Sequence, residues 1–180
     1  TDASIAHLHP DDAVSRAGDS HDWSLFLLGA ARIFGPRQRG FDGVEAGSLP
    51  SGGLSSSAAF SLALLSALAD VNGRVWERPA LAEAAMRVEN EYVGVNCGLL
   101  DPTIIVNAKA GHMVTLDCAT NEVTVEPGPD VAIVAVYSGI PRRLAATGFN
   151  SRTDECREAA KLLAERTGFA PRAEIHALGD

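Results

Sequence analysis

The chain has 180 residues, enough for one good-sized domain or for one domain and part of another. Apolar residues make up 46% of it, and the net charge of −8 argues against nucleic acid or an anionic membrane as a partner. Its three cysteines are scattered, which favours reduced thiols over a disulfide framework. No apolar stretch is long enough to span a bilayer, and no signal peptide begins the chain. We therefore expect a cytoplasmic protein.

The first half of the chain carries the patterns of two helices and one short strand. Apolar residues recur at helix spacing over Asp22–Phe34, and a Gly-Pro pair follows and ends the pattern. Residues Phe41–Ala46 alternate well enough to predict a short strand. A Gly/Ser-rich loop at Gly47–Ser57 then leads into Ala58–Leu68, which is apolar nearly all round and therefore predicts a buried helix.

The second half mixes helices and strands without strict alternation, so the predicted class is α+β. The expected elements are a helix from Pro79 to about Tyr92, a short helix begun by Asp101 and Pro102 and stopped by Gly111, a hairpin of His112–Cys118 and Glu122–Val125, a buried strand Val131–Tyr137, and a helix Ser151–Thr167 closed by Gly168.

The Gly/Ser-rich loop is a candidate phosphate site, because helix N-termini offer unpaired N–H groups and a partial positive charge. The glycines let a ligand approach the backbone, and the serine hydroxyls can bond phosphate or a phosphate-bound Mg²⁺. The alternative is that the serines only cap a core helix. Neither the P-loop pattern nor the Rossmann glycine pattern is present, and no G-x-S-x-G motif suggests a hydrolase.

An acid-rich segment follows, with Glu89 and Glu91 at a predicted helix end and Asp101 further on. Negative charge is unfavourable at a helix C-terminus, so a bound Mg²⁺ could offset one glutamate; the alternative is two solvated glutamates. Asp101 is expected to cap the short helix through its own side chain. That role keeps the carboxylate ionised, and it is compatible with orienting or accepting a hydroxyl proton.

Three ordered motifs resemble the GHMP kinases, the family of galactokinase, homoserine kinase and the mevalonate kinases. The segment P-S-G-G-L-S-S-S-A-A at Pro50–Ala59 looks like the second signature of that family in a short version. Residues Glu89–Asp101 match the pattern E-x-E-[FY]-V-G-x-x-C-G-x-x-D of galactokinases. A similar Y-N-x-R-x-x-E-C stretch of that family corresponds to Phe149–Cys156.

The resemblance implies a fold and a set of roles. The fold would be a GHMP kinase N-terminal domain, like domain 2 of ribosomal protein S5 with a mixed sheet and helices on one side, over residues 1–138, and the start of the C-terminal domain over 139–180. The implied roles are ATP phosphate binding by Gly52, Gly53, Leu54, Ser55, Ser56 and Ser57, Mg²⁺ binding by Ser57 (with Ser56 as the fallback) and Glu89, catalysis by Asp101, and sugar binding by Cys97, Gly98, Asp101 and Phe149.

Departures from the family pattern bear on the substrate. Pro102 replaces the usual Gln after the catalytic Asp, Phe149 replaces a sugar-contacting Tyr, and Asn96 replaces a common Pro. Loss of a substrate-bonding hydroxyl can discriminate strongly against that substrate, so these changes favour a different sugar or sugar derivative. The N-terminal and C-terminal signatures of the family are absent, and we expect this 180-residue piece to have little activity alone.

The sequence thus predicts an ATP- and Mg²⁺-dependent kinase acting on a sugar hydroxyl, a monomer whose partners are ATP and the small-molecule sugar. A second hypothesis is a sugar- and ATP-binding regulator related to galactokinases that works without significant turnover. A third is a structural α+β domain, which would require the three motifs to be accidents.

Overall fold

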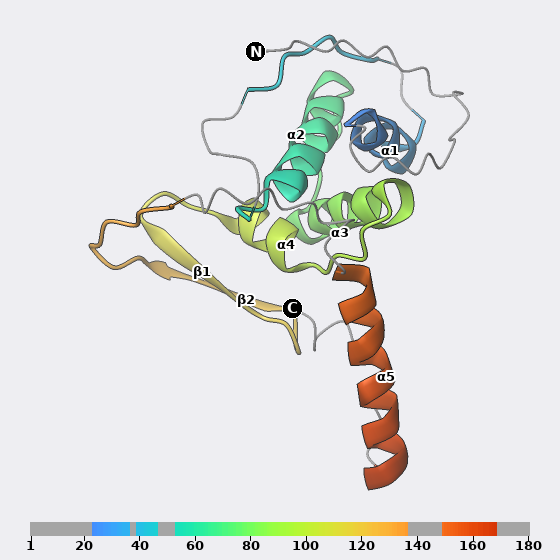
Figure 1. The fold of residues 1–180 in the computed structure, drawn as a ribbon. Coiled ribbons are helices and arrows are strands. Elements are labelled where there is room, and N and C mark those ends of the chain that lie inside the picture. Colours follow the sequence, from blue (N-terminus) through green and yellow to red (C-terminus); the bar gives the residue numbers. More distant parts are fainter. Residues whose placement is uncertain (1–22, 37–38, 47–52, 137–148, 169–180) are drawn as a thin grey trace.

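The computed structural model describes residues 23–36, 39–46, 53–136 and 149–168 (Figure 1). The elements in chain order are α1 (Ser24–Phe34), α2 (Ser56–Val71), α3 (Arg78–Val88), the π-helix η1 (Glu89–Val93), α4 (Leu100–Asn107), β1 (His112–Asp117), β2 (Glu122–Pro127) and α5 (Phe149–Thr167). The α+β class is confirmed, with a two-stranded antiparallel sheet in the described part of the chain.

Helices α1 to α4 pack together and form the hydrophobic core (Figure 1). Leu65 of α2 and Val88 of α3 are completely buried, and leucines and alanines of α2 fill the space around them. The predicted buried helix is therefore confirmed and is longer than the apolar run. Gly29 of α1 allows close packing, because a Cβ there would lie 3.0 Å from side-chain atoms of both Val88 and Tyr92.

The predicted hairpin is confirmed as β1 and β2, paired from His112 with Pro127 to Asp117 with Glu122. Its turn is held by the Asp117 carboxylate, which accepts the N–H of Ala119 at 2.8 Å, and Asn121 takes the left-handed backbone conformation. The hairpin lies beside α4, with which β1 is in contact (Figure 1).

Two predicted strands are wrong over the residues that the structure describes. Residues 41–46 and 131–136 have no strand conformation there and are exposed to solvent. A strand needs a hydrogen-bonded neighbour, and neither segment has one within the described ranges. The larger mixed sheet implied by the family resemblance is likewise not seen within those ranges, where the sheet has two strands.

The prediction for the short helix needs correction at both ends. Helix α4 begins at Leu100 with Leu99 at the N-cap and no side-chain cap, so Asp101 lies inside the first turn and does not cap the helix. Pro102 fits in this turn because the first helical N–H groups need no intrahelical partner. The helix ends at Asn107, where Ala108 turns to an extended conformation, and not at Gly111.

Helix α5 confirms the predicted final helix, beginning two residues earlier than expected and ending where Gly168 adopts a positive φ of 68°. It projects away from the helical core, and its first turn lies near the segment that joins η1 to α4 (Figure 1). That first turn therefore brings residues from late in the chain to the acid-rich segment.

Candidate functional site

The predicted phosphate loop reaches α2 through two residues of positive φ, Gly53 at 85° and Ser55 at 56°. Ser55 is the N-cap residue of α2, yet its side chain makes no capping hydrogen bond. The alternative of a simple serine cap is therefore not borne out at this residue. Gly53, Leu54 and Ser56 are exposed beside the helix N-terminus, whereas Gly52 lies outside the described residues.

Glu89 is buried, with 3% of its surface exposed, directly where α3 gives way to η1. The Ser57 hydroxyl hydrogen-bonds to its carboxyl group, and the charge of Asp101 acts on it. Burial raises the pKa of Glu89 to about 6, the Ser57 hydrogen bond opposes this, and Asp101 raises the pKa further. The fold thus brings together the three residues predicted to hold the metal and perform the chemistry.

The π-helix sets the position of Glu89 relative to the loop that follows. The backbone carbonyl of Glu89 accepts the N–H of Gly94 at 2.8 Å and the N–H of Val95 at 3.1 Å. Gly94 then ends the element in the left-handed conformation, with φ at 82°. Single π turns inside α-helices are rare and often lie at functional sites.

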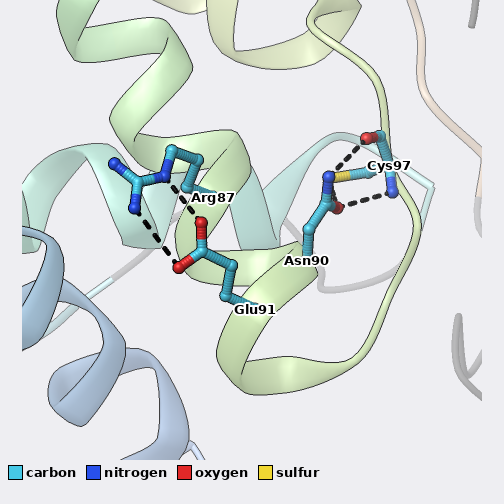
Figure 2. A network of polar contacts seen from close by, with 4 residues as sticks. All are labelled: Arg87, Asn90, Glu91 and Cys97. Atoms are coloured by element: carbon cyan, nitrogen blue, oxygen red, sulfur yellow. Dashed lines mark hydrogen bonds and ion pairs between the residues drawn. The ribbon is translucent and has the colours of Figure 1, made fainter.

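Glu91 behaves differently, although it is only two residues from Glu89. It is exposed and forms an ion pair with Arg87, in which Arg87 Nε lies 2.6 Å from Glu91 Oε1 (Figure 2). This hydrogen bond raises the pKa of Arg87. The interpretation as a solvated glutamate is therefore correct for Glu91 and wrong for Glu89.

The predicted sugar-binding residue Cys97 is held from inside the same segment by Asn90. The N–H of Cys97 donates to Asn90 Oδ1 at 2.9 Å, and Asn90 Nδ2 donates to the Cys97 carbonyl oxygen at 3.2 Å (Figure 2). The thiol of Cys97 also lies 3.3 Å from Asn90 Oδ1. Cys97 and Gly98 are half-buried between Glu89 and Asp101, while the side chain of Phe149 lies outside what the structure describes.

The donor set of the Ser57–Glu89–Asp101 cluster fits a magnesium ion. Mg²⁺ is bound in proteins by one or two carboxylates, with waters and substrate phosphates completing its shell. The described residues contain no group of three or more His, Cys, Asp or Glu side chains that could enclose a metal. One buried carboxylate and one hydroxyl beside a helix N-terminus, with a second carboxylate nearby, therefore suit a metal shared with phosphate and not a closed protein cage.

The chain is similar in sequence to known proteins over much of its length. Residues 26–109 match the family model of the GHMP kinases N terminal domain. A galactokinase from Haemophilus influenzae is 33% identical over 147 residues, covering 78% of this chain and 38% of that protein. A galactokinase from Thermococcus kodakarensis is 34% identical over 148 residues, covering 79% and 42% respectively.

These matches support a galactokinase-like GHMP kinase, the family that the three motifs resemble. It spans about two fifths of the length of the curated relatives it matches. Among the residues that the structure describes, no helix is both long and apolar enough to cross a membrane.

Proposed function

We propose that the protein to which this chain belongs is an ATP- and Mg²⁺-dependent kinase that phosphorylates a sugar hydroxyl. The observation that carries the proposal is the burial of Glu89 against the Ser57 hydroxyl, with Asp101 close enough to act on its charge. A buried carboxylate with raised pKa is costly unless a cation compensates it. The start of α2, where Ser57 lies, is also where phosphate oxygens are favoured.

Each residue of the cluster is assigned the role that the family resemblance implies. Glu89 and Ser57 would hold Mg²⁺, which would supply positive charge to offset that of the phosphates. The backbone from Gly52 to Ser57 cradles those phosphates. Asp101 is exposed, as a group that meets a substrate must be, and orients or accepts the proton of the sugar hydroxyl.

The acceptor side of the site is assigned to Cys97, Gly98, Asp101 and Phe149. Because Phe149 and Pro102 replace a phenol and an amide of the family pattern, we propose a sugar or sugar derivative other than galactose as the preferred acceptor. Residues 1–138 belong to the ATP-binding domain, and residues 139–180 begin the second domain. A monomer is the expected state.

The test is a coupled ADP-release assay on the full-length gene product over a panel of monosaccharides, with and without Mg²⁺. Sugar-dependent ADP formation that needs Mg²⁺ is expected. The variant Asp101→Asn should lower kcat by about 10²- to 10⁴-fold, the range for loss of one general acid–base group. Glu91→Gln removes an exposed carboxylate nearby and should leave kcat unchanged.

Two results would contradict the proposal. Full activity in Asp101→Asn would remove that residue from the chemistry. Binding of both ATP and a sugar without turnover would instead favour the regulatory alternative. Galactose as the best acceptor would overturn only the substrate assignment.

A further inference from the structure

Two side-chain amides hold the loop Gly94–Cys97, which lies between Glu89 and Asp101. Asn90 holds its far end through the Cys97 backbone, as described above. The middle of the loop is bonded by Asn150, which comes from the first turn of α5. The loop is thus fixed by its own helix and by an element more than fifty residues later in the chain.

The contact made by Asn150 uses both ends of its amide. Its Oδ1 accepts the N–H of Asn96 at 2.9 Å, and its Nδ2 donates to the carbonyl oxygen of Gly94 at 3.0 Å. The pair spans two residues of the loop, so it fixes the backbone's direction as well as its distance from α5. No other type of side chain of this size offers a donor and an acceptor in this arrangement.

We propose that Asn150 is a positioning residue: from α5 it sets the backbone of Gly94–Cys97, and through it the place of Cys97 and Gly98 in the acceptor site. The proposal rests on the proposed sugar kinase function for the identity of that site. It makes α5 the element that determines whether the acceptor half of the site is formed, while the phosphate half at α2 is independent of it.

The geometry explains why the effect is selective. Asn150 bonds the loop and not Ser57, Glu89 or Asp101, and the carbonyl of Glu89 is already bonded by Gly94 and Val95. Loss of the Asn150 bonds therefore frees the middle of the loop and leaves the Glu89 end fixed. We expect sugar binding to weaken and ATP binding to be retained.

The experiment compares three variants of the full-length protein. Asn150→Ala removes both bonds, and Asn150→Asp keeps an acceptor for Asn96 but sets a second oxygen against the Gly94 carbonyl. Asp154→Asn is the matched control. It replaces a carboxylate oxygen by an amide nitrogen, the reverse of the change in Asn150→Asp. Asp154 lies four residues further along α5, and its exposed side chain is paired with Arg157. The readouts are amide hydrogen exchange at Asn96 and the separate KM values for ATP and for D-galactose or the best acceptor of the panel.

In Asn150→Ala the Asn96 amide should exchange about three- to tenfold faster, the size of effect expected for one hydrogen bond. The sugar KM should rise by a similar factor, and the ATP KM and the melting temperature should change little. In Asn150→Asp the Asn96 amide should stay protected while the sugar KM still rises. Asp154→Asn should match the wild type throughout.

Unchanged exchange at Asn96 in Asn150→Ala would overturn the anchoring itself. Two results would overturn the link between Asn150 and the acceptor site. One is faster exchange at Asn96 with an unchanged sugar KM, and the other is faster exchange with equal changes in the sugar and ATP KM values. A wild-type protein that turns over no sugar would refute the proposed function and this link together, and the exchange result would still decide whether Asn150 anchors the loop.

Discussion

At the scale of single residues, burial separates two glutamates that the sequence places side by side. Glu89 is buried and its carboxyl group is influenced by Ser57, while Glu91 is exposed and pairs with Arg87. The family motifs predict that Ser57, Glu89 and Asp101 belong to one site, and the fold places them near one another. The bonds made by Asn90 and Asn150 were not predicted, although Asn150 lies in the third motif, because their partners are backbone groups that the sequence does not identify.

The raised pKa of Glu89 predicts a stability that depends on pH. The pKa of about 6 in the folded state exceeds the ordinary value of 4.5, so the folded state binds the proton more tightly. Stability from this group is fully present below pH 4.5 and is lost as the pH rises through 6. Without Mg²⁺, the ionised buried group costs about 2 kcal/mol at neutral pH.

Glu89→Gln removes this cost and should therefore be more stable than the wild type at pH 8 and similar to it at pH 4.5. Urea unfolding in the presence of a chelator measures the difference, which should grow by about 1–2 kcal/mol between the two pH values. Glu91→Gln is the control and should show no such growth. A difference that is constant with pH would contradict the assigned environment of Glu89.

The hydrogen bond from Ser57 opposes the rise in the pKa of Glu89. Ser57→Ala should therefore raise this pKa further and increase the Mg²⁺ concentration needed for half-maximal activity. The exposed neighbour Ser56 offers a matched control, since Ser56→Ala removes the same hydroxyl without touching Glu89. Carboxyl NMR titration and a Mg²⁺ dependence of activity measure the two effects. A larger effect of Ser56→Ala than of Ser57→Ala on the Mg²⁺ dependence would point to the fallback assignment of Ser56.

At the scale of elements, helices were predictable and isolated strands were not. The positions of α1, α2 and α5 follow from apolar spacing and from glycines at their ends, because these signals lie within the helix itself. The segments 41–46 and 131–136 carry strand-like composition, but strand formation depends on a neighbour that composition does not specify. The conversion of α3 into η1, which packs against α1, was also not predicted.

Close packing of α1 on the α3–η1 segment predicts an unusual response to a glycine substitution. Alanine in a helix is ordinarily about 1 kcal/mol more favourable than glycine. At Gly29, however, the new Cβ would lie 3.0 Å from both Val88 and Tyr92, so Gly29→Ala should destabilise the fold by about 1–3 kcal/mol.

Chemical denaturation of Gly29→Ala measures this effect. Gly40→Ala is the control, because a Cβ at Gly40 meets no atom within 4 Å. Since Val88 directly precedes Glu89, the substitution should also lower activity of the full-length protein. A stabilised Gly29→Ala protein would show that α1 and η1 are further apart than the structure places them.

At the scale of the whole molecule, the phosphate half of the proposed site is more complete in this chain than the acceptor half. The 147 aligned residues cover 38% of the Haemophilus influenzae relative. Four apolar side chains of residues 131–136 are more than 60% exposed. Exposed apolar segments of this kind usually mark contact surfaces. The cluster of Ser57, Glu89 and Asp101 is nevertheless assembled within this chain.

We expect the 180-residue chain by itself to bind Mg²⁺-ATP weakly and to turn over little, because phosphoryl transfer depends on groups that surround the phosphates from several sides. Calorimetric titration and the coupled ADP assay, run in parallel on the 180-residue chain and on the full-length protein, measure the contrast. Robust sugar-dependent ADP formation by the 180-residue chain would contradict this expectation.

The π turn at Glu89–Val93 makes this region intolerant of changes in length. Each residue of an α-helix advances the chain by 1.5 Å and rotates it by about 100°. Deleting one residue after Glu89 would restore ordinary α-helical spacing. The chain that follows the deletion would then be rotated by about 100° about the helix axis. Asn90 and Asn150 would then face the wrong backbone groups. In this short stretch, substitutions should be tolerated at exposed positions such as Glu91, whereas single-residue insertions and deletions should be eliminated by selection.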